Sequence, residues 1–487
     1  MDENFIFCAD VGSTWTKSCL FRRELKKISL EYRTDAPTTR SDLYRGFSAC
    51  LDSVLTHTGV KIKPMLLASS SAKGGLSIAA SGLVPELTMK AAREAACTAG
   101  GKVVRSFHGV FGSYDIEEIN TLAPDIFLFT GGTDGGNRTM VLENAEKLKK
   151  LKKNIVIIYA GNNTCAGEVH AILKKHTCIT VKNVFPELNR LDVSGASAAI
   201  QEIFISKIAL GKGLGKIIKK LNADLLPTPL SIFNFAAHIS RHMRALAPFM
   251  IIDPGGATTD VYSASPAAAG NENIVFRGLP EPFIKRTVEG GAGLHANAEN
   301  ALLSAQIKNE ICLDYARRLK NTSVINTTAI NTAGNRHEEN MLRIIATACV
   351  SEAVRRHTGK MHSYNSVNGQ VRVQSGKDLR LISTVILSGG FLSRIKDQEI
   401  FIEALRNARA HPENDPGCEL LLPEAPRVYT DTEYLLPLCA LVSQKYPADA
   451  VQYFSDHLTD SEINEIKNTD NNYISGACQN EYQSAAV

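Results

Sequence analysis

The sequence predicts a two-lobed α/β protein in which a further α/β domain is inserted into the first lobe. Three observations carry this prediction. An apolar run followed by an acid, glycines and hydroxyl residues occurs at 10–17 and again at 253–260. Between about 65 and 182, strand-like and helix-like patterns alternate, as expected of βαβ units with a parallel sheet. A third glycine motif follows another strand-like run at 384–390.

Composition bounds the class of protein. The 487 residues are 44% apolar and 21% charged, which is typical of a folded chain with two to four domains. A net charge of +4 gives no electrostatic case for a nucleic-acid partner. No run approaches the ~18 apolar residues of a membrane span, and the N-terminus lacks the features of a secretory signal. We therefore expect a cytoplasmic protein without nucleic-acid or membrane partners.

Cysteine usage fits this compartment. The 11 cysteines are scattered, with no CxxC pair and no zinc-like Cys/His spacing. Reduced thiols in a cytosolic protein are the expected state. The absence of clustered thiolates in the sequence also argues against an iron–sulfur cluster.

The first lobe is expected to begin with residues 1–64. The apolar run 5–11 predicts a buried strand, and TKSCLFR directly after it predicts the second strand of a hairpin. Residues 41–57 place apolar side chains on one helical face and predict a helix. Residues 65–190 are assigned to the inserted α/β domain.

A glycine-rich segment of the inserted domain deserves its own hypothesis. GGTDGGN at 131–137 ends an apolar strand, and Gly-Asn-Asn at 161–163 ends the next. Open α/β sheets bind ligands at this carboxyl edge. Three interpretations of this segment are compatible with the sequence: a ligand-binding loop, a contact with a partner protein, and a loop with a purely architectural role.

The second lobe is expected over 249–455. Residues 191–248 look mainly helical and either complete the first lobe or link the two lobes. Within the second lobe we predict strands at 249–253 and 380–390 and helices at 291–318, 337–357 and 435–444. Residues 456–487 are polar and are expected to form a frayed tail.

The first candidate phosphate loop is the run from Asp10 to Lys17, DVGSTWTK. Gly12 permits close approach of the backbone to phosphate oxygens, and Ser13, Thr14 and Lys17 supply hydroxyls and a positive charge. Asp10 is a candidate for holding Mg²⁺ through water, because Mg²⁺ keeps part of its hydration shell.

The second candidate loop repeats this order about 240 residues later, in DPGGATTD. Asp253 occupies the place of Asp10 as the second candidate metal ligand. The candidate phosphate contacts here are Gly255, Gly256, Thr258 and Thr259. Pro254 lacks a backbone N–H, so this loop offers one donor fewer, and slow turnover or ATP binding without turnover stays open.

The third motif is Ser388-Gly389-Gly390 after the strand-like STVIL. A glycine pair between a strand and a helix lets the backbone lie against a nucleoside. Gly389 and Gly390 are therefore candidate adenosine contacts.

The order DxGSTxTK, DxGGATTD and SGG resembles the actin, sugar-kinase and heat-shock-70 ATPase superfamily. The resemblance implies the actin-like (ribonuclease H-like) ATPase fold with ATP and Mg²⁺ as cofactors. It also suggests that Glu289, which follows the second loop, positions the metal or the attacking water. Asp10, Asp253 and Glu289 are thus the candidate catalytic residues.

Other segments are similar to a narrower family. ASSSAKGGLSIAASG, PDIFLFTGGTDGGN, IDPGGATTDVYS and RTVEGGAGLHANAENAL resemble the glutamate mutase accessory proteins, often called MutL or GlmL. The resemblance runs from about residue 4 to about 450. It implies an ATP-dependent, chaperone-like reactivase that acts on the subunits of an adenosylcobalamin-dependent mutase, and a homodimer is compatible with it. A small-molecule kinase and an ATP-binding assembly factor without turnover remain alternatives.

Overall fold

The computed structural model describes most of the chain between residues 2 and 460. The described ranges are 2–12, 15–39, 41–59, 63–71, 76–152, 154–209, 213–266, 274–321, 336–366, 369–395, 398–411 and 417–460. The candidate residues Ser13 and Thr14, and the predicted tail beyond 460, lie outside them. Within these ranges no helix has the length and apolar character needed to cross a bilayer.

The first lobe is built on a five-stranded sheet of order β3-β2-β1-β4-β10. β1 and β2 form the predicted hairpin, β3 extends it antiparallel, and β4 and β10 run parallel to β1. The strands are β1 (Asp2–Val11), β2 (Trp15–Glu24), β3 (Lys27–Pro37), β4 (Pro64–Ser70) and β10 (Leu226–Pro227). Helix α1 (Leu43–Thr58) packs on this sheet.

The second lobe repeats the arrangement. Its sheet has the order β14-β12-β11-β17-β19-β20, in which β11, β12 and β14 form the antiparallel part and β17 and β19 run parallel to β11. The strands are β11 (Phe249–Pro254), β12 (Thr259–Ala264), β14 (Ile284–Glu289), β17 (Thr384–Leu387), β19 (Arg427–Thr430) and β20 (Thr459–Asp460). The first five strands of this sheet, from β14 to β19, repeat the order and directions of β3-β2-β1-β4-β10 in the first lobe, and β20 is added at the edge. This repeat confirms the predicted two-lobed actin-like fold.

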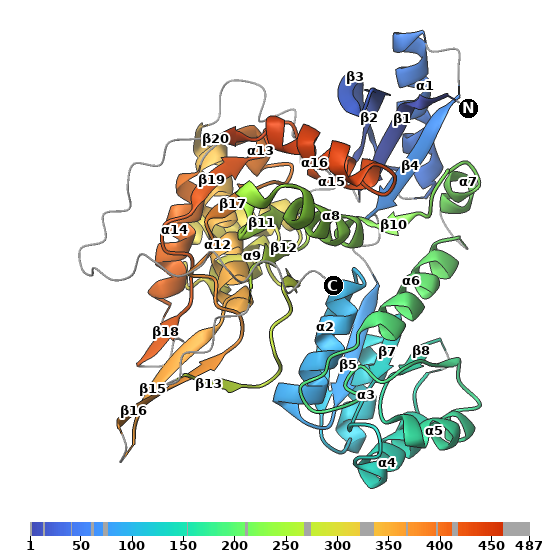
Figure 1. Cartoon of the computed structure of the whole chain (residues 1–487), viewed down its shortest axis with the longest axis vertical. Coiled ribbons are helices and arrows are strands. Elements are labelled where there is room, and N and C mark those ends of the chain that lie inside the picture. Colours follow the sequence, from blue (N-terminus) through green and yellow to red (C-terminus); the bar gives the residue numbers. More distant parts are fainter. Residues whose placement is uncertain are drawn as a thin grey trace.

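Three helices lie between the two sheets (Figure 1): α8 (Thr228–His242), α15 (Leu436–Val442) and α16 (Pro447–Asp456). One continuous hydrophobic core joins their apolar faces to both sheets. It includes Ile6, Cys8, Phe21, Leu67, Phe235, Ile239, Phe249, Ile251, Leu438 and Phe454, all 1% exposed or less. The lobes therefore share a core on one side of their junction.

The inserted domain has a parallel sheet of order β6-β5-β7-β8-β9, with its first strand inside the sheet. Its strands are β5 (Ser77–Gly82), β6 (Lys102–His108), β7 (Ile126–Phe129), β8 (Val156–Tyr159) and β9 (Cys178–Thr180). Its helices are η1 (Pro85–Met89), α2 (Lys90–Thr98), α3 (Ser113–Leu122), α4 (Arg138–Leu148), η2 (Asn163–Cys165), α5 (Ala166–Ile172) and α6 (Ser194–Ala209). In Figure 1 the domain lies below the first lobe and beside the second.

Residues 65–70 depart from the sequence-based boundaries. The predicted insertion begins at 65, but β4 pairs along its length with β1 in the first sheet. A fully buried apolar run has the same sequence pattern whichever of the two sheets it belongs to. Only its strand pairing assigns it to the first sheet. The chain returns to the first lobe through α7 (Leu214–Ile218) and β10.

The helix predicted over 291–318 is wrong as a single element. It is divided into α9 (Ala298–Ser304) and α10 (Glu310–Asn321). Gln306 has a positive φ of 59°, which no helix continues through, and the Asn309 side chain accepts from the backbone of Ile311 and Cys312 to begin α10. Over the described residues, the lobe also has α12 (Arg336–His357), α13 (Leu392–Ile395) and α14 (Glu399–Arg409), and η3 (Arg244–Leu246) leads into it.

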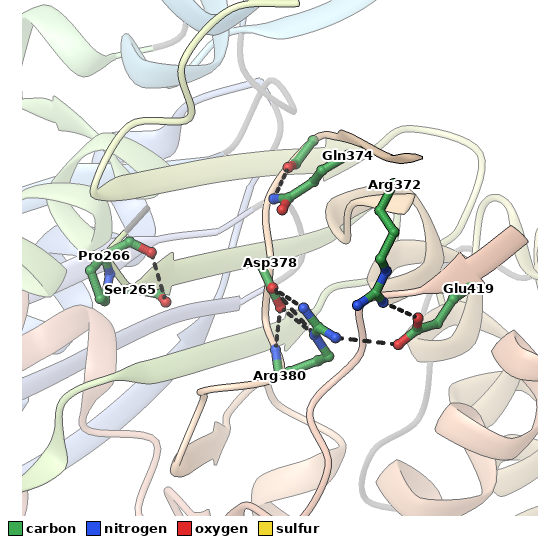
Figure 2. Close-up of polar contacts among 8 residues, drawn as sticks. Ser265, Pro266, Arg372, Gln374, Asp378, Arg380 and Glu419 are labelled. Atoms are coloured by element: carbon green, nitrogen blue, oxygen red, sulfur yellow. Dashed lines mark hydrogen bonds and ion pairs between the residues drawn. The ribbon is translucent and has the colours of Figure 1, made fainter. Parts of the chain in front are cut away.

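A small sheet of order β13-β16-β15-β18 projects from the second lobe (Figure 1). Its strands are β13 (Ile274–Arg277), β15 (Lys360–Ser366), β16 (Gly369–Ser375) and β18 (Cys418–Leu420). Figure 2 shows how ion pairs hold its base: Glu419 receives Arg372 at 3.1 Å and Arg380 at 3.4 Å, and Arg380 also pairs with Asp378 at 2.6 Å. The strand predicted over 380–390 is shorter in the structure, where β17 covers only 384–387. Arg380 lies in a turn before it.

Gly82 is expected to be required for the inserted domain. A Cβ at this strand end would lie 2.2 Å from the backbone nitrogen of Met89, so the η1 turn would have to shift. We expect Gly82→Ala to destabilise the domain by about 1–3 kcal/mol, seen as a lower thermal midpoint and faster proteolysis of the insert.

Gly167→Ala is the matched control in the same domain. Apart from its chain neighbours and the backbone of α5 itself, no atom lies within 4 Å of its Cβ position, and alanine favours helix by up to about 1 kcal/mol. An unchanged midpoint for Gly82→Ala would contradict the close packing described here.

Candidate functional site

In the first lobe, the parallel strands deliver three side chains to one point. Asp10 near the end of β1 accepts hydrogen bonds from Ser69 on β4 at 3.0 Å and from Thr228, directly after β10, at 2.6 Å. All three are buried. Because the carboxyl ends of parallel strands share one sheet edge, residues 218 positions apart in the chain meet at Asp10.

The second lobe has the same arrangement of strand ends. Asp253 stands near the end of β11, Ser388 follows β17, and Asp431 follows β19. The Ser388 hydroxyl donates to Asp431 at 2.8 Å. The backbone N–H groups of Leu435 and Leu436 donate to the same carboxylate, so Asp431 caps the start of α15.

Lys17 joins the two lobes electrostatically. It pairs across the first hairpin with Asp10, and its Nζ lies 3.3 Å from the ring centroid of Tyr434 in the second lobe. Burial lowers the pKa of Lys17 to about 8, and the carboxylates of Asp10 and Asp253 work against that fall. The predicted phosphate-binding lysine therefore lies within the field of both candidate metal ligands.

Gly389 and Gly390 form a wall without side chains at this point. A Cβ on Gly389 would lie 3.0 Å from the Asp253 carboxylate oxygen, and one on Gly390 would lie 3.3 Å from Lys17 Nζ. Gly389 also has a φ of 98°. The structure thus brings the third glycine motif to the first two, as a nucleotide cleft requires.

The two aspartates differ in their surroundings. Burial raises the pKa of Asp10, although the hydrogen bond from Thr228, the charge of Lys17 and the hydrogen bond from Ser69 oppose the rise. Burial and the neighbouring Asp260 carboxylate raise the pKa of Asp253 to about 7. Among the described residues, we find no side chain that donates a hydrogen bond to Asp253. Its charge is therefore poorly compensated.

The uncompensated charge of Asp253 bears on whether the site fits a complex of magnesium and nucleotide. Over the described residues, no three His, Cys, Asp or Glu side chains come together as a ready-made metal site. Mg²⁺ is commonly held by only one or two carboxylates, with waters and phosphates completing its shell. Asp10 and Asp253 fit that donor set, and a cation would relieve the charge on Asp253.

The glycine loops are held by backbone contacts. Gly12 N donates to Trp15 O at 3.0 Å in the first hairpin, and Gly255 N donates to Thr258 O at 2.8 Å in the second. The Gly256 carbonyl accepts from His295 and Ala296. These contacts fix the turns that were predicted to approach phosphate.

The two threonines of the second loop separate. The Thr258 hydroxyl lies 3.4 Å from the Asp260 carboxylate. Thr259 is fully buried, and its hydroxyl donates to Ala292 O at 3.0 Å. The hydroxyl of Thr259, expected to bind phosphate, is thus engaged inside the second lobe, where it braces the loop.

Glu289 lies at the end of β14, opposite Thr259 in the register of the two strands. Its carboxylate accepts from Gly291 N at 3.2 Å and pairs with Arg356 at 3.3 Å. A position beside the second loop suits the predicted role toward metal or water. The ion pair with Arg356 orients the carboxylate.

Several residues of the site were missed by the motif analysis. Ser69, Thr228, Asp431 and Tyr434 lie outside the glycine motifs, and Asp260 lies inside one without being selected. A usable signal existed for Ser69, which lies near the end of an apolar run that forms a parallel strand, whereas the strands before Thr228 and Asp431, LP and RVYT, are too short or too polar to give one.

The GGTDGGN loop uses its polar groups internally. Asp134 accepts from Asn163 N at 2.8 Å and from Asn183 at 2.9 Å, while Asn162 accepts from Gly135 N at 3.0 Å. Gly131, Gly132 and Gly135 have positive φ. These contacts favour the architectural reading of the three that the sequence left open.

The strand orders of the two sheets define the actin-like ATPase fold. A family model described as MutL protein matches residues 6–458. Protein MutL of Clostridium tetanomorphum is 31% identical over 468 residues, spanning 92% of this chain and 98% of that protein. The chain belongs to the MutL family, the glutamate mutase accessory proteins.

Solved structures show only distant likeness. A diol dehydratase-reactivating factor in nucleotide free form is 12% identical, with 91% of this chain and 100% of that chain covered and a TM-score of 0.35. A glycerol dehydratase reactivase is 11% identical, with 83% and 95% covered and a TM-score of 0.32. Xylulose kinase from Bifidobacterium adolescentis is 11% identical, with 92% and 93% covered and a TM-score of 0.30. The fold assignment rests on the sheet topology.

Binding of ATP with Mg²⁺ is expected to depend on pH in two directions. Below pH 7 the Asp253 carboxyl becomes protonated and attracts a cation less; above pH 8 Lys17 loses the charge that attracts phosphate. Each limb approaches a tenfold change per pH unit. The other charged groups facing Asp253 are Asp10, Asp260 and Asp431.

The measurement is the ATP·Mg²⁺ dissociation constant from calorimetry between pH 5.5 and 9.5. Asp253→Asn should remove its share of the acid limb, and Lys17→Met the alkaline limb, while the exposed Asp52→Asn on α1 changes neither. An acid limb as steep in Asp253→Asn as in the unaltered protein would contradict the assignment.

Proposed function

We propose that this protein is an ATP-dependent accessory protein that reactivates an adenosylcobalamin-dependent mutase, with glutamate mutase as its client. Membership of the MutL family supports the mutase as partner. The observation that carries the ATP dependence is the meeting of Lys17 from one lobe with Asp253, Gly389 and Gly390 from the other.

In this proposal, the phosphates of ATP lie between the two hairpin turns. Lys17 supplies the positive charge, and the two hairpin turns, closed by the backbone hydrogen bonds of Gly12 and Gly255, would place their backbone beside the phosphates. Gly389 and Gly390 leave space for the nucleoside. Contacts from both lobes to one ligand would hold the lobes together while the γ-phosphate is present.

Asp10 and Asp253 would hold Mg²⁺, which neutralises developing charge on the phosphates when bound. Hydrogen bonds from Ser69 and Thr228 hold Asp10 in place before any metal arrives. Glu289, fixed by Arg356, would orient the attacking water. Phosphoryl transfer to water needs positioning and charge neutralisation more than covalent chemistry, and these side chains supply both.

The conformational cycle would follow from the shared ligand. Loss of the γ-phosphate removes contacts that both lobes make, so the lobes can separate. The helices α8, α15 and α16, which pack on both sheets, are the elements about which they would turn. Movement of the lobes would be transmitted to the bound mutase and release its damaged cobalamin.

One observation favours a second candidate, an ATP-binding assembly factor without turnover. Pro254 ends β11 next to the second loop and offers no N–H to a phosphate. A small-molecule kinase on the same fold would instead produce a phosphorylated compound.

The test measures phosphate release and mutase activity together. Purified protein is mixed with ATP, Mg²⁺, free adenosylcobalamin and a glutamate mutase inactivated by damaged cobalamin. We expect ATP-dependent recovery of mutase activity, with phosphate release stimulated by the inactivated mutase. Asp10→Ala and Asp253→Ala should lower both by roughly 100-fold or more, because each removes electrostatic stabilisation of the transferring group.

Asp52→Asn serves as the control and should retain full activity. Recovery with a non-hydrolysable ATP analogue would favour the assembly factor over the ATPase. Recovery without any nucleotide, or ATP binding with no effect on the mutase, would sink the proposal as stated.

A further inference from the structure

The inserted domain docks on the second lobe through helix α2, which packs against strand β14. Both ends of this contact are polar. At the start of α2, Lys90 pairs with Glu281, which also receives Lys285 at 2.8 Å. Near its end, Arg286 reaches the backbone carbonyls of Cys97 and Gly101. The two attachments are about 10 Å apart along the helix.

Arg286 belongs to this contact and also touches the candidate nucleotide site; Lys102 of β6 makes a second link nearby, donating to Gly290 O at 3.4 Å. Its side chain is 2% exposed. Nη2 lies 2.6 Å from the Asp260 carboxylate and Nε 2.9 Å from the same oxygen. Nη1 donates to Cys97 O at 2.6 Å and to Gly101 O at 3.3 Å. One guanidinium thus satisfies a carboxylate in one domain and two carbonyls in the other.

The carbonyl partners suit a cation. Cys97 is in the last turn of α2, at the negative end of the helix dipole, and its carbonyl accepts from Gly100 N at 3.0 Å as well as from Arg286. Arginine presents several donors in a rigid planar fork, so it can bridge groups on different elements, whereas lysine presents a single compact charge. The geometry of this bridge therefore depends on arginine.

Asp260 connects the Arg286 guanidinium to the candidate nucleotide site. It pairs with Asp253 across the second hairpin, and Thr258 of the glycine loop lies beside it. Whatever changes the charge or the position of Asp253 acts on Asp260. Asp260 in turn holds Arg286, and Arg286 holds the end of α2.

We infer that Arg286 is a positioning residue that links the occupancy of the nucleotide site to the placement of the inserted domain. The inference rests on the proposed function, since it needs ATP at this site. Binding of ATP with Mg²⁺ adds a cation and phosphates next to Asp253 and Asp260. The balance of charge around Asp260 then changes, and with it the grip of Arg286 on Cys97 and Gly101.

The contact between α2 and β14, called the seam from here on, is made by Lys90, Cys97 and Gly101 on one side and by Glu281, Lys285 and Arg286 on the other. It is polar enough to open. Arg286, Lys285 and Glu281 are almost wholly buried and are held by ion pairs. Burial works to raise the pKa of Glu281, but Lys285 and Lys90 lower it, so the carboxylate is ionised. Polar contacts between domains suit relative motion better than an apolar interface does.

The experiment compares hydrogen–deuterium exchange of residues 97–104 in the full-length protein with and without ATP·Mg²⁺. ATP affinity is measured in parallel by calorimetry. In the unaltered protein we expect ATP to change the exchange rate of this segment about tenfold or more. In Arg286→Met we expect ATP to change it less than twofold, together with weaker ATP binding because Asp260 is left without its partner.

Arg286→Lys separates coupling from folding. It keeps a cation beside Asp260, so ATP affinity should return to within about threefold of the unaltered protein, while the response of 97–104 stays lost. Lys90→Met is the matched control at the other end of α2: it removes an ion pair of the same seam but touches no residue of the nucleotide site, and the response should persist.

The outcomes are distinguishable. No ATP binding by the unaltered protein would overturn both the proposed function and this inference. ATP binding with an undiminished response of 97–104 in Arg286→Lys would overturn the inference alone. Equal loss of the response in Lys90→Met would also overturn it, because the seam as a whole, and not Arg286, would then carry the effect.

Discussion

Acidic side chains crowd the junction between the two sheets, and the surrounding structure is arranged to offset them. Asp10, Asp253 and Asp431 stand at strand ends, and Asp260 is the hairpin partner of Asp253. Carboxylates repel one another strongly where water is scarce. Lys17 acts on Asp253 and Arg33 acts on Asp431, so positive charge of the first lobe offsets acids of the second. Without this exchange of charge, closing the two lobes would be unfavourable.

The two sheets differ in how they compensate the charge of their buried carboxylates. Asp10 receives two hydroxyl donors, and Asp431 receives a hydroxyl and two backbone N–H groups. Asp253 has no comparable donor among the described residues, and its pKa rises to about 7. The first-lobe carboxylate is thus held in place by its own hydrogen bonds, whereas the second-lobe carboxylate would gain most from the cation that we propose. Such a division lets a ligand complete the site and draw the lobes together in one event.

Local features of the fold could be predicted from the sequence because their cause is local. The hairpins at Gly12 and Gly255 follow from an apolar strand, a glycine turn and a second strand. The alternation of Ile28, Leu30 and Tyr32 with polar residues is a local strand signal for β3 as well. What neighbouring residues cannot indicate is pairing between distant segments, as in the assignment of β4 to the first sheet or the contact of Thr228 with Asp10.

The same limit applies to the contact between domains. Arg286 lies in an unremarkable strand, KRTVE, and its importance comes from Cys97 and Asp260, which reach it from two other parts of the chain. Likewise, the hydroxyl of Thr259 is indistinguishable in sequence from that of Thr258, but the strand register turns it inward to Ala292.

The point of insertion has a mechanical consequence. The chain leaves the first lobe after β4 and returns through β10, and those two strand ends carry Ser69 and Thr228 to the Asp10 carboxylate. Both connections of the inserted domain therefore lead to hydroxyls that donate to one candidate metal ligand: β4 carries Ser69, and the returning chain reaches Thr228 through α7, which packs against α1 of the first lobe, and β10. A load on that domain, such as the pull of a bound protein, would be delivered to Asp10 by the covalent chain itself. Strain could then travel from the outer domain inward as readily as nucleotide chemistry travels outward.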